Sequence, residues 1–291
     1  MSMHDVEVGP GVTVRVAEKG ATVDGPAVLL IHGLGVGGGY WDLPVAGYST
    51  MDHLVGRGLR AYALDHRGYG RSTSVSGLSV RAETAARDLA RVIDFIRSRA
   101  GVERVCLVGH SWGGMVASMT AAADPDSVDS LVLVGMPFRR LHRQFQERIG
   151  VMRAAAAPVD GWIPNPTHVG LEDRLFAHDP EVLAAYKTMV EADYPRIPLG
   201  ILDDCLALPH ADSLARIACP VLVMCGTLET VVDRGDMLDL LDELQSVQKE
   251  LAFVGNVGHL AGLEKLVHRR IDGAVVDWAL EHGQRDGSQG D

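Results

Sequence analysis

The sequence predicts an α/β fold in which helices flank a mostly parallel sheet of eight strands. Two observations lead to this prediction. Short apolar runs alternate with longer amphipathic segments along most of the chain, and most of these runs are apolar throughout, as in strands buried on both faces. With 291 residues, of which 47% are hydrophobic and 22% charged, the chain can bury a substantial core.

The strands are expected in a simple order along the chain. Residues 6–20 alternate polar and apolar side chains around a Gly-Pro-Gly turn, which is typical of a β-hairpin. Six later runs are short and apolar, and they span residues 27–33, 59–68, 104–110, 130–137, 220–226 and 249–255. The hairpin and these six runs together give eight strands.

Helices are expected between and after these strands. In residues 80–100, apolar side chains recur at helical spacing with charged residues between them. Another helix begins directly after Ser111, and a final amphipathic helix is expected over residues 262–281. These helices would cover the faces of the sheet.

One long segment interrupts this alternation. Between residues 138 and 212, prolines break the chain into short helical pieces. We therefore predict an inserted, mainly helical cap over residues 138–212. Residues 1–137 and 213–282 would then form the α/β core, and residues 283–291 a disordered tail.

Composition and charge exclude several classes of function. The formal net charge of −11 opposes a general affinity for nucleic acid or for an anionic membrane. No apolar run approaches the roughly 18 residues that span a bilayer, and the N-terminus shows no secretion signal. The four cysteines have no metal-binding spacing, and no phosphate loop or dinucleotide fingerprint is present. We expect a cytoplasmic protein without a metal or other cofactor.

A serine stands at the turn between a predicted strand and the helix that follows it. Ser111 is the centre of the segment Gly-His-Ser-Trp-Gly, residues 109–113. A nucleophile at such a turn needs a strained backbone, and glycines two residues away prevent clashes with neighbouring chain. Because ligands bind at the carboxyl ends of strands in open α/β sheets, this serine is a candidate catalytic residue.

Three other features also follow predicted strands: His-Gly-Leu-Gly at residues 32–35, an acidic loop at residues 226–233, and His259. With Ser111 they give the chain order serine, acid, histidine. This order and the segments LLIHGLG, ALDHRGYGRS and GHSWGG resemble the α/β-hydrolase superfamily, over residues from about 12 to about 281.

The resemblance implies a serine hydrolase of small acyl compounds. Two backbone N–H groups, those of Leu34 and Trp112, would form the oxyanion hole. His32 and His110, which flank the site, would have supporting roles. No nucleic-acid or membrane partner is implied.

The expected chemistry follows from the residue types. The Ser111 hydroxyl is a weak nucleophile at neutral pH and needs a base, for which His259 is the candidate. A carboxylate behind the imidazole would fix its tautomer and stabilise the imidazolium. The family usually places an aspartate three residues after the glycine that ends the penultimate strand, and here that position is Glu229. Asp233 on the same loop is the alternative acid, or it caps the helix that follows.

A serine at this turn favours acyl chemistry, whereas relatives that form alkyl-ester intermediates need an aspartate there. We predict cleavage of a small-to-medium, largely apolar ester or thioester through an acyl-enzyme. The alternatives are an acyltransferase, a carbon–carbon bond hydrolase, a cofactor-independent oxygenase or perhydrolase, and a non-catalytic ligand-binding protein.

The predicted cap contains the candidates for substrate selection. Aromatic and aliphatic side chains expected to line an acyl pocket are Phe138, Phe145, Trp162 and Leu260, and packing of the cap against the core is the alternative. Four arginines are clustered at positions 139, 140, 143 and 148. They could dock a coenzyme A or carrier-protein thioester, or a substrate carboxylate, unless they form a solvated helix face.

Overall fold

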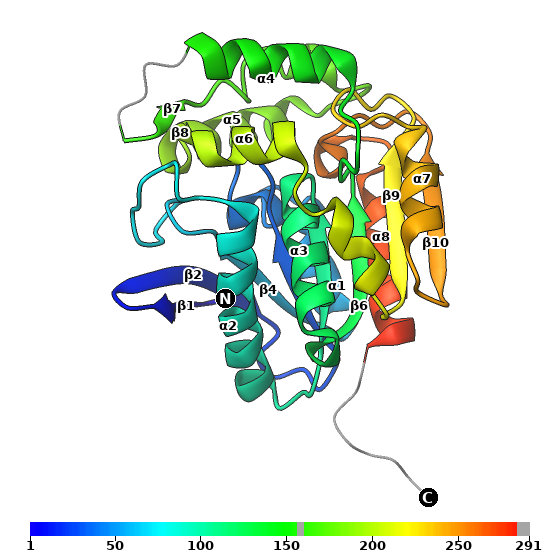
Figure 1. The fold of residues 1–291 in the computed structure, drawn as a ribbon. Helices are drawn as coiled ribbons and strands as arrows, with labels where there is room; N and C mark the ends of the chain where they lie inside the picture. The colour runs from blue at the N-terminus through cyan, green and yellow to red at the C-terminus, as the bar shows by residue number, and fades with distance from the viewer. Residues whose placement is uncertain (156–159, 284–291) are drawn as a thin grey trace, which may run out of the picture.

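The computed structural model describes residues 1–155 and 160–283. Its centre is one sheet of eight strands in the order β1-β2-β4-β3-β5-β6-β9-β10 (Figure 1). The strands are β1 (Ser2–Gly9), β2 (Val12–Lys19), β3 (Ala27–Ile31), β4 (Arg60–Asp65), β5 (Val105–His110), β6 (Val128–Val134), β9 (Val221–Gly226) and β10 (Lys249–Val254). The eight-stranded sheet of the prediction is confirmed.

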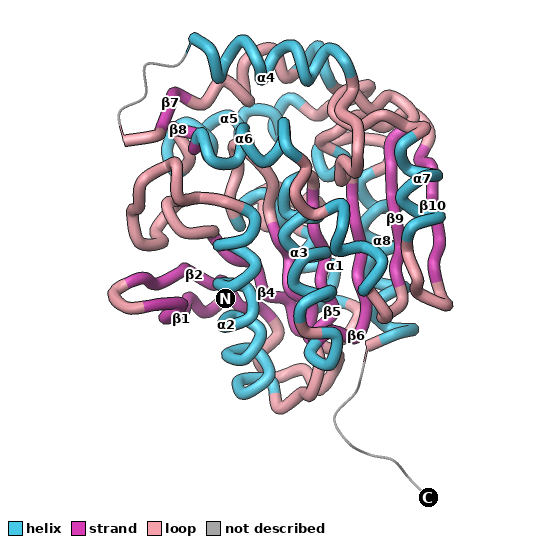
Figure 2. The backbone as a smooth tube through the Cα atoms, viewed as in Figure 1, coloured by secondary structure: helices cyan, strands magenta, loops and turns pink. Residues whose placement is uncertain are grey.

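One strand of the sheet, β2, runs opposite to all the others. β1 pairs with β2, and β2 with β4, in antiparallel register, whereas every pair from β4 to β10 is parallel. The parallel strands lie side by side in Figure 2, so their carboxyl ends meet at one edge. That edge is the place where a ligand site is expected.

Helices cover both faces of the sheet, which explains why the central strands are apolar throughout. In β3, Leu29 and Ile31 belong to one buried cluster, which includes residues of α2 (Ala82–Ala100), α3 (Trp112–Ala123) and α7 (Asp236–Glu243). Val28 and Leu30 belong to the opposite cluster. That cluster includes residues of α1 (Thr50–Gly56) and α8 (His268–His282). Successive side chains of the strand therefore enter different cores.

The segment between β6 and β9 lies over the carboxyl edge of the sheet, at the top of Figure 1. Its elements are α4 (Arg143–Ala155), β7 (Trp162–Pro164), α5 (Pro180–Asp193), β8 (Arg196–Pro198) and α6 (Leu199–Ala207). The antiparallel pair of β7 and β8 was absent from the sequence prediction. Strands of three residues that contain proline give no alternation from which to predict them. We call residues 138–212 the cap.

Two buried carboxylates attach the cap to the core. Asp204 of α6 accepts hydrogen bonds from the backbone N–H of Ala82 at 2.6 Å and from Nε1 of Trp112 at 3.1 Å. Asp236 at the start of α7 accepts from three consecutive backbone N–H groups, of residues 138–140, at 2.9–3.0 Å. The cap is thus held by polar contacts at the places where the core helices begin.

The final helix is a correction to the prediction. It begins at His268, whereas the apolar pattern suggested residue 262. The carboxylate of Glu264 instead accepts hydrogen bonds from the backbone N–H groups of Phe176, Ala177 and Gly258 at 3.1–3.3 Å. This residue is therefore fixed in the connection before α8, which follows a 3₁₀ turn at Ala261–Leu263.

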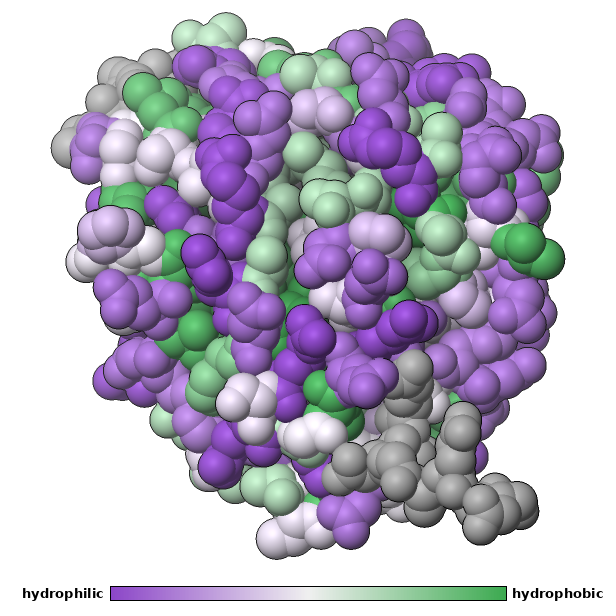
Figure 3. All heavy atoms as spheres, turned by 60° about the horizontal axis from the view of Figure 1, so that its bottom comes forward, coloured by the Kyte–Doolittle hydropathy of each residue, from purple (hydrophilic) through white to green (hydrophobic). Residues whose placement is uncertain are grey.

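The face away from the cap is mostly hydrophilic, with scattered apolar residues (Figure 3). Within residues 1–155 and 160–283, no helix combines the length and apolarity needed to span a membrane. The predicted disordered tail lies outside the described residues, apart from Gly283.

Candidate active site

Ser111 occupies a sharp turn between β5 and α3. Its backbone has φ 55° and ψ −124°, a region that residues other than glycine rarely adopt. Its N–H donates to the carbonyl of Val134 on the adjacent strand at 2.9 Å. Because such a conformation is strained, it persists only where the surrounding structure imposes it, as is common at functional sites.

The glycines around Ser111 allow this turn to form. A Cβ on Gly113 would lie 2.5 Å from the carbonyl oxygens of Ile31 and His32, and one on Gly109 would lie 2.6 Å from the Gly113 oxygen. These distances are far shorter than van der Waals contact. The backbones of β3, β5 and α3 therefore approach one another where only glycine fits.

His259 and Glu229 meet beside this turn. The Nδ1 atom of His259 lies 3.1 Å from Oε2 of Glu229 and 3.0 Å from Oε1. Glu229 is only 7% exposed, and its Oε1 also accepts hydrogen bonds from the backbone N–H groups of Thr230 at 2.9 Å and Val231 at 2.8 Å. The carboxylate is thus held by the backbone on one side and by the imidazole on the other. Its contact with Nδ1 orients the imidazole ring.

The surroundings of Glu229 favour its charged form. Burial acts to raise the pKa of this carboxyl, but the charge and hydrogen bond of His259 and the two backbone donors act against burial. The net result is that the pKa of Glu229 is lowered below its ordinary value of 4.5. A charged carboxylate is the form that can stabilise an imidazolium.

Gly135, at the end of β6, leaves room for this pair. It has φ +56°, and a Cβ built on it would lie 3.2 Å from Nδ1 of His259 and 3.3 Å from Oε2 of Glu229. A side chain here would press on both groups. The absence of one therefore helps to keep the histidine and the carboxylate in contact.

The alternative acid, Asp233, makes different contacts. Its Oδ1 accepts from the backbone N–H groups of Gly235 at 2.9 Å and Asp236 at 3.2 Å, directly before α7. Among the hydrogen bonds of the described residues, none joins it to His259. Asp233 therefore binds the backbone of the turn that leads into α7, whose N-cap residue is Gly235.

Two further histidines near the site are buried and neutral. His110 donates from Nε2 to the carbonyl of His259 at 2.9 Å, and burial, followed by the charge of His259, lowers the pKa of His110 to about 3. His32 accepts from the N–H of His66 at 3.0 Å, and burial lowers its pKa to about 4. Both serve as uncharged supports for the surrounding backbone.

A cavity of about 270 Å³ opens beside Ser111 and His259. Its wall is formed by core and cap residues, which are mostly apolar: Leu34, His110, Ser111, Phe145, Arg148, Ile149, Met152, Pro166, Thr167, Val169, Arg174, Leu175, Tyr186, Thr230, Val231, His259 and Leu260. The serine and the histidine therefore face a space that can hold a small apolar group.

Two of the four predicted pocket residues line this cavity, Phe145 and Leu260. Phe138 and Trp162 do not, which corrects the expectation. Phe138 is fully buried, and its N–H donates to Asp236. The indole Nε1 of Trp162 donates to the carbonyl of Val75 at 2.9 Å, so this ring packs against the core.

The four clustered arginines do not all lie at the cavity. Arg139 pairs with Glu243 at 2.7 Å, Arg140 with Asp239 at 2.7 Å, and Arg143 with Glu147 at 3.7 Å. Of the four, Arg148 is the one that lines the cavity. Arg174, which the sequence analysis did not single out, lines the cavity with it.

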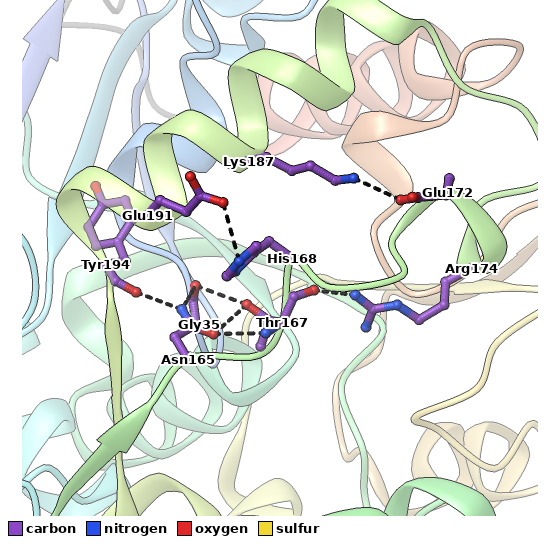
Figure 4. Close-up of polar contacts among 9 residues, drawn as sticks. All are labelled: Gly35, Asn165, Thr167, His168, Glu172, Arg174, Lys187, Glu191 and Tyr194. Carbon is purple, nitrogen blue, oxygen red and sulfur yellow. Dashed lines mark hydrogen bonds and ion pairs between the residues drawn. The ribbon is translucent and has the colours of Figure 1, made fainter.

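The loop that carries Leu34 is attached to the cap (Figure 4). The carbonyl of the next residue, Gly35, accepts a hydrogen bond from Nδ2 of Asn165 at 2.8 Å, and Thr167 Oγ1 lies 3.4 Å from the same oxygen. Asn165 also donates to the carbonyl of Tyr194 at 2.7 Å. Nothing in the sequence around residues 164–167 beyond its prolines marked this contact.

Trp112, the other residue expected at the oxyanion hole, begins α3 immediately after Ser111. The N-terminal end of a helix presents free N–H groups and favours negative charge.

Among residues 1–155 and 160–283, no cluster of three or more His, Cys, Asp and Glu residues is arranged to hold a metal ion.

Comparison with known proteins gives the family. The family model described as serine aminopeptidase, S33 (Hydrolase_4) matches residues 26–265. The chain is 27% identical to the monoacylglycerol lipase of Mycolicibacterium smegmatis over 266 residues, which are 88% of each chain. It is 28% identical to the putative carbamate hydrolase RutD of Klebsiella pneumoniae over 221 residues, covering 71% of this chain and 75% of that one.

A solved structure supports the fold. An esterase from Thermogutta terrifontis superposes with a TM-score of 0.74 and 21% identity, covering 98% of this chain and 100% of the esterase. The family match covers most of the sequence, and the sheet has the predicted order of strands and helices. The chain belongs to the serine aminopeptidase S33 family and is a hydrolase of the α/β-hydrolase superfamily.

Proposed function

We propose that this protein is a serine hydrolase that cleaves a small-to-medium, largely apolar ester or thioester, with Ser111, His259 and Glu229 as its catalytic triad. One observation carries the proposal. Ser111, in a strained turn, and His259, paired with a buried carboxylate, lie on the wall of the same largely apolar cavity. The similarity to a monoacylglycerol lipase and to an esterase supports an ester as the substrate.

The mechanism follows from these positions. His259 takes the proton of the Ser111 hydroxyl as its oxygen attacks the ester carbonyl, and Glu229 stabilises the resulting imidazolium. The backbone N–H groups of Leu34 and Trp112 stabilise the oxyanion, and loss of one such donor is expected to cost roughly 3–4 kcal/mol of transition-state stabilisation. The alcohol or thiol leaves with the proton from His259, and water then releases the acyl group.

A fluorophosphonate probe tests the proposal directly, because it reacts with a serine only when that serine is activated. Intact mass spectrometry of the wild type should show one adduct per chain. The Ser111→Ala variant should show none, and labelling of His259→Ala should slow by a factor of about 10³ or more. Unmodified wild-type protein, in a folded sample, would contradict the proposal and favour a binding protein or an oxygenase on the same fold.

A further inference from the structure

Two guanidinium groups lie on the wall of the cavity that contains Ser111 and His259. Arg148 comes from α4 and is exposed at the rim, with its guanidinium 5.1 Å from the centre of the Phe145 ring. Arg174 comes from a 3₁₀ turn in the cap and is partly buried. Among the cavity-lining residues that the structure describes, these two are the cations other than histidine.

Neither guanidinium has a carboxylate partner at ion-pair distance in the described part of the chain. Arg174 donates one hydrogen bond, to the backbone carbonyl of Thr167 (Figure 4), and its buried Nε has no hydrogen-bond partner. Glu172, close by in the sequence, pairs with Lys187 at 2.9 Å and acts on Arg174 only from beyond ion-pair distance, where its charge raises the pKa of that guanidinium. The other arginines of the original cluster each have an acidic partner.

The two positive charges also act on each other. Although Arg148 is exposed overall, partial desolvation of its guanidinium lowers its pKa, and the charge of Arg174 lowers it further. Burial likewise lowers the pKa of Arg174. Two like charges on one cavity wall disfavour each other, and an anion bound near both would offset this effect.

We propose that the substrate is an ester with a free carboxylate at its far end, which Arg148 and Arg174 bind while Ser111 attacks the ester carbonyl. This inference rests on the proposed function and adds the substrate class. Guanidinium groups match a carboxylate through paired hydrogen bonds. The volume of about 270 Å³ suits a small molecule, such as a half-ester of a short dicarboxylic acid.

The two arginines stand out against the negative overall charge of the protein. A chain with a formal net charge of −11 repels an anionic substrate at long range. Two cavity-lining arginines that have no carboxylate at ion-pair distance among the described residues oppose this repulsion locally.

The test compares two substrates that differ in one charge: the mono-4-nitrophenyl ester of adipic acid, and the same compound with its carboxylate methylated. The measured quantity is the ratio of kcat/KM for the anionic ester to kcat/KM for the neutral one. Removing a hydrogen-bonding charge should lower this ratio by about 10-fold or more in Arg148→Gln and in Arg174→Gln. The control Arg143→Gln removes the same charge from α4 outside the cavity, and its ratio should stay at the wild-type value.

An unchanged ratio in both cavity variants would overturn the proposal, as would a wild type that prefers the methylated ester. If Arg174→Gln fails to fold because the contact with Thr167 is lost, Arg148→Gln at the exposed rim still decides the question. Failure of the wild type to hydrolyse either ester would count against the proposed function itself, so the two failures are distinguishable.

Discussion

The turn around Ser111 and the cap that covers it are held in place by different interactions. At the turn, backbone atoms of three elements approach so closely that Gly109 and Gly113 have no room for a Cβ. The cap is attached through side chains, chiefly the buried carboxylates of Asp204 and Asp236. Backbone geometry therefore determines the position of Ser111. In the cap, substitutions at cavity-lining residues would leave the two attaching carboxylates in place.

The largest loss of activity is expected for a substitution of Glu229, the proposed catalytic acid in the core. In Glu229→Gln, the amide oxygen can still accept from Thr230 and Val231, which directs the NH₂ group toward Nδ1 of His259. The imidazole is then held in the wrong tautomer, and kcat for a 4-nitrophenyl ester should fall by about 10²–10⁴-fold. The matched variant Asp233→Asn should keep kcat within about threefold. Equal losses in both variants would contradict the assignment of the acid.

A pair of glycine substitutions compares the two regions directly. Gly113→Ala places a Cβ against backbone carbonyls that cannot move independently, and should lower the free energy of unfolding by about 2–4 kcal/mol. Gly150→Ala lies in α4 of the cap, where no atom is within 4 Å of the added Cβ. It should raise the free energy of unfolding by about 0.5–1 kcal/mol. Urea denaturation measures both, and equal tolerance at the two sites would contradict the comparison.

The smallest expected effect is on the pH dependence of stability. Because the pKa of Glu229 is lower in the folded state than in the unfolded chain, its ionisation stabilises the fold above about pH 4.5. This contribution is lost as the pH falls through the folded-state value. Wild-type Tm should therefore decrease more than the Tm of Glu229→Gln between pH 6 and pH 3. Parallel decreases in differential scanning fluorimetry would show that Glu229 makes no such contribution.

The same contrast explains how far the sequence could predict this molecule. The central strands of the core are mostly apolar because both faces are covered, so their order along the chain and the positions at their ends could be predicted from local patterns. Ser111, Glu229 and His259 each follow such a strand. The parallel topology brings the ends of these strands to one edge, while the contact between Glu229 and His259 also depends on Gly135 and on the N–H groups of Thr230 and Val231.

The cap offered no comparable pattern. Phe138 and Trp162 were expected in the pocket, but neither lines it. The backbone N–H of Phe138 and the indole Nε1 of Trp162 both bond to the core. Arg174 and Asn165 were missed because their roles depend on contacts with residues 167 and 35, which only the folded chain brings together. Predictions from periodicity fail where single side-chain contacts determine the structure.

The hydrogen bond from Asn165 to the Gly35 carbonyl joins these two regions. Asn165 is buried, and it belongs to the cap, whereas Gly35 directly follows the residue whose N–H is proposed to stabilise the oxyanion. Any movement that lifts residues 165–167 from the core also removes the donor from this loop. The position of the proposed oxyanion loop therefore depends on two donors from the cap, Nδ2 of Asn165 and Oγ1 of Thr167, as well as on the core.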